Sequence, residues 1–185
     1  MKRIFSFISV FAVVALTGCT CKTVETFEEA ADPVALCDGA KEAWDDVKGG
    51  MHAAWGTPDL VYSRSLVPQN LTDEYKVTAW RGEKVSAQVV LWTTKDLKGV
   101  ECEISDFVAD GATLPASIAK AHFVRYTIAD KVDKSCLCGR PNGHPAILQA
   151  DMLDNIDSFD IDGESTRPVW ITVAIPQSAK PGIYK

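Results

Sequence analysis

The chain has 185 residues, 46% of them hydrophobic, and carries 19 basic against 25 acidic side chains, a net charge of −6. This negative balance argues against nucleic acid and other polyanions as ligands, because those ligands are held by clusters of Lys and Arg. The length is sufficient for one domain with a proper hydrophobic core.

The N-terminus has the pattern of a lipoprotein signal peptide. Lys2 and Arg3 precede an apolar run over residues 4–16, which is shorter than a spanning helix but right for a secretory leader. The run ends in Thr17-Gly18-Cys19, where small residues suit a signal peptidase and the cysteine thiol can accept a diacylglyceryl group. We therefore expect residues 1–18 to be a signal peptide and Cys19 to be lipidated. The alternative is an ordinary cleavage site or membrane anchor with a chance cysteine.

The residue after Cys19 bears on the location of the protein. It is Thr20 and not the aspartate that commonly holds such lipoproteins in the inner membrane, so the sequence predicts a lipid-anchored protein of the outer membrane or cell surface. A periplasm-facing orientation stays open. Removing residues 1–18 leaves 167 residues with 17 basic and 25 acidic side chains, a net charge of −8.

Two short segments precede the predicted domain. Residues 19–31, in which Thr, Lys and Glu are prominent, predict a lipidated tether. Residues 32–50 predict a helical preamble, because Asp32 and Pro33 suit the first positions of a helix and the pair Gly49-Gly50 suits its end.

From residue 51 onward the apolar residues recur with a period of two, which is typical of strands. Predicted strands cover 85–92, 122–128 and 169–175, with shorter ones at 75–80 and 100–108 and a further pair at 52–55 and 60–62. Short alternating strands separated by Gly and Pro turns predict an all-β fold, a β-sandwich of antiparallel strands over 51–185 with a short N-terminal helix. A new alternating run begins at Ile183, so we expect the sandwich to be truncated at its C-terminal end. The alternative is a short edge strand.

The cysteines beyond Cys19 give no clear metal site. Cys136 and Cys138 form one C-x-C pair, whereas structural zinc generally needs two ligand pairs. We therefore interpret this pair as a disulfide or as free thiols. Cys102 alternates with apolar neighbours and is predicted to face the core.

The acidic stretch 151–163 and the scattered histidines also fall short of a site. An EF-hand alignment fails at its first and last positions, which leaves a different calcium loop or a solvated loop. No G-x-S-x-G, H-E-x-x-H or phosphate-binding loop occurs. Carboxylates are numerous enough for a glycosidase pair, but the sequence marks no two of them as facing each other. The residues thus predict no catalytic group, metal or cofactor.

Several segments in a fixed order resemble a known family. The stretch Trp80–Gln88, followed by 123–126, 138–140, 150–154 and finally 167–173 with 181–185, is similar to the N-terminal domain that precedes the catalytic barrel in glycoside hydrolase family 123. That family comprises β-N-acetylgalactosaminidase-like enzymes common in gut Bacteroidetes. The similarity extends over roughly residues 51–185, nearly all of the predicted domain.

The resemblance implies a role and a limit. Such enzymes hydrolyse terminal β-linked N-acetylhexosamine with help from the 2-acetamido group of the substrate, using an Asp-Glu pair on the barrel. It therefore implies a non-catalytic accessory domain of a glycoside hydrolase, with the catalytic barrel of the same polypeptide as its main partner and glycans as further candidate partners. The expected lipid at Cys19 adds the membrane as a partner. The residues it marks as structural or interface positions are Trp80, Arg81, Glu83, Arg125, Asp151 and Trp170. The alternative is a free-standing carbohydrate-binding or structural envelope lipoprotein.

Overall fold

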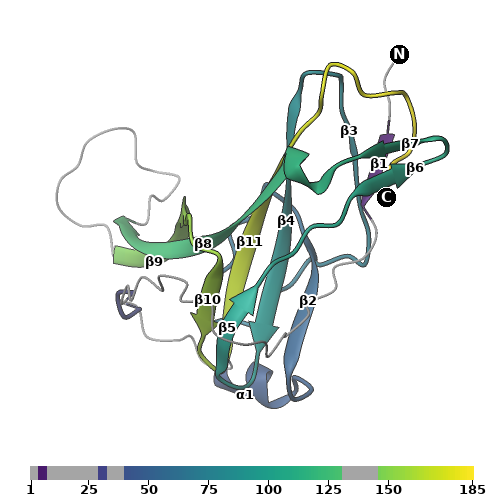
Figure 1. Cartoon of the computed structure of the whole chain (residues 1–185). Coiled ribbons are helices and arrows are strands. Elements are labelled where there is room, and N and C mark those ends of the chain that lie inside the picture. The colour runs from purple at the N-terminus through teal and green to yellow at the C-terminus, as the bar shows by residue number, and fades with distance from the viewer. Residues whose placement is uncertain (1–3, 8–28, 33–39, 131–145) are drawn as a thin grey trace.

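The computed structural model describes residues 4–7, 29–32, 40–130 and 146–185 (Figure 1). Its main element is a five-stranded antiparallel sheet with the order β2-β4-β11-β8-β9. These strands are β2 (Met51–Gly56), β4 (Lys84–Thr93), β8 (Ala119–Asp130), β9 (Ala146–Leu153) and β11 (Ser165–Ala174). The predicted all-β class with antiparallel strands is confirmed.

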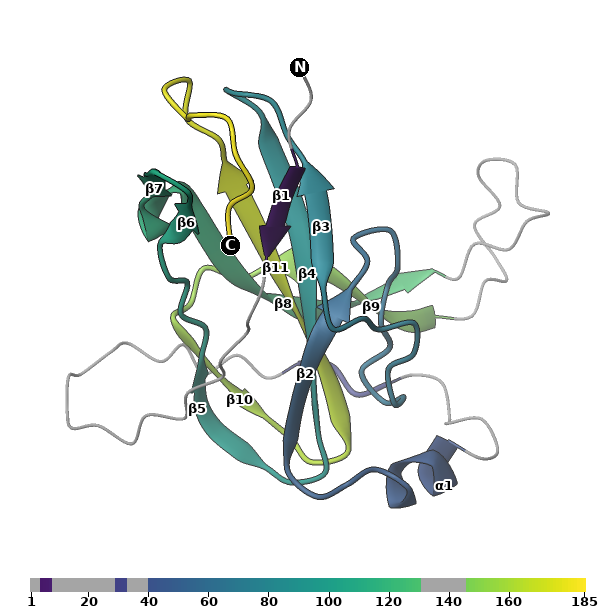
Figure 2. The same ribbon diagram turned by 90° about the vertical axis from the view of Figure 1, so that its right-hand side faces the viewer.

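Three strand pairs lie across the core from this sheet and supply the second layer (Figure 2). They are β1 (Ile4–Phe7) with β3 (Tyr75–Thr78), β5 (Leu97–Glu101) with β10 (Ser158–Ile161), and β6 (Phe107–Ala109) with β7 (Ala112–Leu114). One helix, α1 (Ala40–Asp45), and a 3-10 turn at Ala116–Ile118 complete the described elements.

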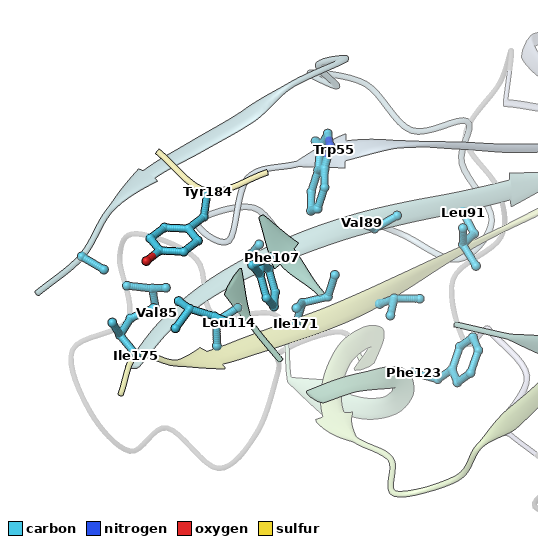
Figure 3. Close-up of a cluster of buried hydrophobic side chains, with 14 of the residues drawn as sticks. Trp55, Val85, Val89, Leu91, Phe107, Leu114, Phe123, Ile171, Ile175 and Tyr184 are labelled. Atoms are coloured by element: carbon cyan, nitrogen blue, oxygen red, sulfur yellow. The ribbon is translucent and has the colours of Figure 1, made fainter. Parts of the chain in front are cut away.

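The core forms where alternating side chains of both layers meet. Val85, Val89 and Leu91 of β4 line the core along its length, and Ile171 of β11 lies beside Phe107 of the second layer (Figure 3). The other members of this cluster are Trp55, Ala79, Ala87, Val100, Leu114, Phe123, Ile161, Val169, Val173, Ile175, Ala179 and Tyr184. Because β4 and β11 pair along their whole lengths, their alternation places one continuous apolar face on the core, as the sequence predicted.

The C-terminal segment belongs to the second layer. Tyr184 is only 1% exposed and enters the core, and its hydroxyl donates to the Lys180 carbonyl at 3.0 Å. Lys185 and Val108 of β6 exchange two backbone hydrogen bonds of 2.9 Å. This segment is therefore paired with β6 in the manner of a strand.

The described elements correct several boundaries. The single strand predicted over 100–108 is two strands, because β5 ends at Glu101 and β6 begins at Phe107. The predicted strand at 60–62 lies in a loop, and β9 and β10 were not predicted. Within the predicted helical preamble, α1 covers only Ala40–Asp45, and residues 33–39 lie outside the described part.

The first described strand lies in the predicted signal peptide. β1 pairs antiparallel with β3, with Ile4 opposite Thr78 and Phe7 opposite Tyr75. The removal of residues 1–18 stays a prediction. Among the described helices, none combines the length and apolar character needed to cross a membrane.

Candidate functional site

β8 changes its partner strand midway. At that point some of its backbone N–H and C=O groups need hydrogen-bond partners other than the neighbouring strand. Its first half, through Phe123, pairs with β11, and its second half, from Val124 on, pairs with β9, with a bulge between Arg125 and Tyr126. Pro168 of β11 sits just beyond the last rung of the β8 ladder, where its missing N–H costs no hydrogen bond to β8. The β8 backbone groups that turn away from β11 there must find other partners.

Glu29 and Arg167 supply those partners. The Arg167 guanidinium donates from Nη1 and Nη2 to the two carboxylate oxygens of Glu29, each at 2.7 Å, in a bidentate pair. Nη1 also donates to the Val124 carbonyl at 3.0 Å, and the Tyr126 N–H donates to Glu29 Oε1 at 2.9 Å. We call this arrangement the Glu29–Arg167 clasp. It satisfies the backbone of β8 at the point where the strand leaves β11.

The electrostatics of the clasp favour the charged form of Glu29. Burial acts to raise the pKa of this carboxyl, but the hydrogen bonds and charge of Arg167, the Tyr126 N–H and the charge of Arg64 together lower the pKa below its ordinary value. The Arg167 guanidinium also lies over the Tyr126 ring, 4.9 Å from its centroid, and over the Phe159 ring at 4.3 Å. The clasp is therefore a paired, hydrogen-bonded charge cluster and not an isolated buried ion.

Arg125, one of the predicted site residues, belongs to the same interior region. It is 3% exposed, its Nε donates to Asp154, and its guanidinium lies 5.7 Å from the centroid of the Phe159 ring. Glu29 and Asp154 thus both face arginines. For Glu29 this environment lowers the pKa, whereas a glycosidase general acid needs an environment that raises its pKa.

Sequence reasoning missed Glu29, which it placed in the tether. Its partner Arg167 is 138 residues away in the chain, so no local pattern links them. The available signal was the presence of Arg125 and Arg167 in strands whose other residues are mostly apolar. A buried arginine implies a buried acceptor, but not which one.

Three predicted site residues, Trp80, Arg81 and Glu83, lie on the turn between β3 and β4. The Glu83 carboxylate accepts the Trp80 N–H at 2.6 Å, and the Glu83 N–H donates to the Trp80 carbonyl at 3.2 Å. Gly82 has φ +81°, which a residue with a Cβ rarely adopts. Trp80 is 50% exposed and Arg81 is exposed as well. The turn is closed internally and presents both side chains outward.

The other two predicted positions lie elsewhere. Asp151 is exposed on β9, and Trp170 is half-buried on β11, opposite Gln88 of β4 and His122 of β8. The structure therefore does not gather the predicted residues into one site. Cys19, Cys136 and Cys138 lie outside the described residues.

The remaining candidate residues, Cys102 and the acidic stretch 151–163, do not form a site either. Cys102 is a free, partly buried thiol that packs against the core, as predicted. In the acidic stretch, Asp160 accepts hydrogen bonds from the Gly99 N–H at 2.9 Å and from Lys98 Nζ at 3.1 Å. Across the described ranges, no three His, Cys, Asp or Glu side chains gather closely enough to hold a metal ion.

Comparison with known proteins identifies the domain type. Residues 55–185 match the family model described as "Glycoside hydrolase 123 N-terminal domain". A similar solved structure is a family 123 glycoside hydrolase from Clostridium perfringens, with 23% sequence identity and a TM-score of 0.57. The alignment covers 72% of this chain but only 23% of that enzyme. No curated protein sequence matches.

Proposed function

Because the chain belongs to the glycoside hydrolase 123 N-terminal domain family, we propose that it is the non-catalytic accessory domain of a secreted, lipid-anchored glycoside hydrolase. The observation that carries the proposal is the family match over residues 55–185, more than half of the chain. The order of the motifs from Trp80 to Lys185 supports the same conclusion. In this proposal a catalytic barrel follows the domain in the same polypeptide and carries the Asp-Glu pair.

The environment of the buried carboxylates supports a non-catalytic role for this domain. Glu29 is held by Arg167 with its pKa lowered, and Asp154 accepts from Arg125. Each carboxylate is hydrogen-bonded to an arginine that belongs to β8 or contacts it: Arg125 lies in β8, and Arg167 donates to the Val124 carbonyl of β8. Glu29, whose pKa is lowered, is not arranged to protonate a leaving group, because that role requires a carboxyl group that keeps its proton.

We propose N-acetylhexosamine-containing glycans as the substrate class of the whole enzyme. The resemblance to β-N-acetylgalactosaminidase-like proteins supports this class. The similar enzyme from Clostridium perfringens is a family 123 glycoside hydrolase whose structure was studied for glycolipid glycan hydrolysis. Release of an aryl group from an N-acetylgalactosaminide is a direct assay for such an activity.

The test compares this chain with the polypeptide encoded by the complete reading frame. We expect the complete polypeptide to hydrolyse the aryl N-acetylgalactosaminide and the 185-residue chain to show no turnover. Turnover by the 185-residue chain would place the chemistry in this domain and refute its accessory role. A complete reading frame without a barrel would also refute the proposal.

Lipid anchoring rests on the Lys2-to-Cys19 pattern and needs its own test. Labelled palmitate should be incorporated into the wild-type protein and recovered with the membrane fraction. The Cys19→Ser variant should lose both the label and the membrane association. Equal behaviour of the two proteins would contradict anchoring, while leaving the accessory role untouched.

A further inference from the structure

Three exposed apolar residues stand on segments at the end of the domain that carries Lys185. They are Trp80 on the β3–β4 turn, Val108 on β6 and Ile183 in the C-terminal segment, with exposed fractions of 50%, 55% and 58%. Figures 1 and 2 both place these three segments together at one end of the sandwich. We call these three residues the Trp80 patch.

The pairing of the C-terminal segment with β6 places two members of the patch on one face. Val108 and Lys185 exchange both backbone hydrogen bonds, so their side chains lie on the same side of the pair. Ile183 is two residues from Lys185 and shares that side. Phe107 and Tyr184, which alternate with them, are buried in the core. Val108 and Ile183 therefore point outward from the second layer.

Trp80 points away from the core by the same alternation. Tyr75, Val77 and Ala79 pack in or against the core, so the residues between and after them face outward. The turn is fixed to the end of β11, because the Gly82 N–H donates to the Ile175 carbonyl and the Ile175 N–H donates to the Glu83 carbonyl, each at 2.8 Å.

Electrostatics connect β3 with the chain end independently. The pKa of Glu74 is lowered, chiefly by its hydrogen bond and ion pair with Lys76, and also by the charge of Lys185. Lys185 therefore lies near the start of β3 as well as beside β6. The β3–β4 turn continues the β4–β11 pair, and the C-terminal segment pairs with β6, so the three residues stand on segments whose backbones are held in place at this end of the domain.

We infer that the Trp80 patch is the surface on which the catalytic domain of the same polypeptide packs. The inference rests on the proposed function. A polypeptide that follows Lys185 starts on this face, and the similar enzyme is much longer than the part matched here. Trp80 is followed by Arg81, and Trp and Arg are among the residue types that contribute most of the binding free energy at protein interfaces. A closed turn presents Trp80 with little ordering cost.

The described chain offers a matched control. Ile128 of β8 is 56% exposed, nearly the same as Ile183, but it lies beyond the bulge, on the β8–β9 hairpin that projects away from the chain end (Figure 1). A substitution there has the same chemistry without touching the patch.

The experiment uses the complete polypeptide with a photo-cross-linking residue, p-benzoylphenylalanine, in place of Trp80 or of Ile128. We expect peptide mapping to find cross-links from position 80 to segments after residue 185, and none from position 128. We also expect Ile183→Ser to speed proteolytic cleavage between the domains about tenfold, and Ile128→Ser to leave the rate unchanged.

The outcomes separate this inference from the proposed function. A complete polypeptide that hydrolyses the aryl N-acetylgalactosaminide, but forms no cross-links from position 80, would overturn the inference alone. An inactive polypeptide with those cross-links would overturn the proposed activity and support the interface. If N-acetylgalactosamine-containing glycans protect the β3–β4 turn from hydrogen exchange while position 80 forms no cross-links, the patch binds sugar and the inference is wrong.

Discussion

Replacing Glu29 with Gln removes the negative charge that faces Arg167 while keeping the size of the side chain. In the clasp, the Glu29 side chain is 9% exposed and that of Arg167 is 5% exposed, so solvent screens their interaction only weakly. Removing one partner of a buried ion pair costs about 3–5 kcal/mol. Gln still accepts hydrogen bonds, and Arg167 keeps its contact with the Val124 carbonyl. We therefore expect Glu29→Gln to lower the free energy of unfolding by about 2–3 kcal/mol.

Urea denaturation at neutral pH, followed by tryptophan fluorescence, measures this loss. The control is Asp160→Asn, which removes the charge from an exposed pair with Lys98 and should hardly move the midpoint. A double-mutant cycle with Arg167→Met isolates the interaction, and we expect a coupling energy of about 1–3 kcal/mol. A coupling energy near zero would refute the reasoning, because it would mean that Glu29 and Arg167 do not form the clasp.

The same pair predicts how stability changes with pH. The pKa of Glu29 is lowered from its ordinary value of 4.5, so the folded state favours the ionised form. The stabilisation is complete above the unfolded pKa and is lost as the pH falls through the lower, folded pKa. The difference in unfolding free energy between wild type and Glu29→Gln should therefore be constant above pH 4.5 and shrink below it. A difference that already shrinks near neutral pH would contradict the assignment.

Three further outcomes can be checked. Tyr126→Phe removes a buried hydroxyl that lies 2.9 and 3.0 Å from two backbone carbonyls, and urea titration should show a loss of about 1–2 kcal/mol, whereas an unchanged midpoint would exclude these hydrogen bonds. Gly56→Ala would place a methyl group 2.7 Å from Tyr62 Oη and 2.8 Å from Val90 Cγ2, so thermal unfolding should report a loss of about 1–3 kcal/mol. Burial raises the pKa of the Cys102 thiol, and iodoacetamide should therefore modify it several-fold more slowly than in urea, as measured by mass spectrometry. Equal rates would show that the thiol is accessible.

The long strands could be predicted because alternate residues face the same core along the whole of each strand. β4 and β11 pair over their entire lengths and place every second residue in the core, so a period of two identifies them. β8 was predicted as a strand, but its exchange of partners after Phe123 depends on where β9 lies. Tyr126 is 2% exposed and Ile128 is 56% exposed, although both fall on the same predicted face.

The parts that were missed depend on distant partners. β10 contains Asp160, whose carboxylate is satisfied by β5, and an acidic residue gives no local sign of such a contact. The single run predicted over 100–108 breaks because its two halves pair with different strands, β10 and β7. The turn at Trp80 was marked by its family resemblance, while its exposure follows from which face of β3 meets the core.

With Cys19 acylated as proposed, the Glu29–Arg167 clasp would also limit how far the domain can stand from a lipid bilayer. It fixes the chain to the domain at Glu29. The part of the predicted tether that can span the distance to a membrane is then the segment from Cys19 to Glu29. Fully extended, that segment reaches about 35 Å. An enzyme anchored in this way would work on glycans within a domain's width of the membrane. Breaking the clasp would lengthen this reach without altering the proposed catalytic domain.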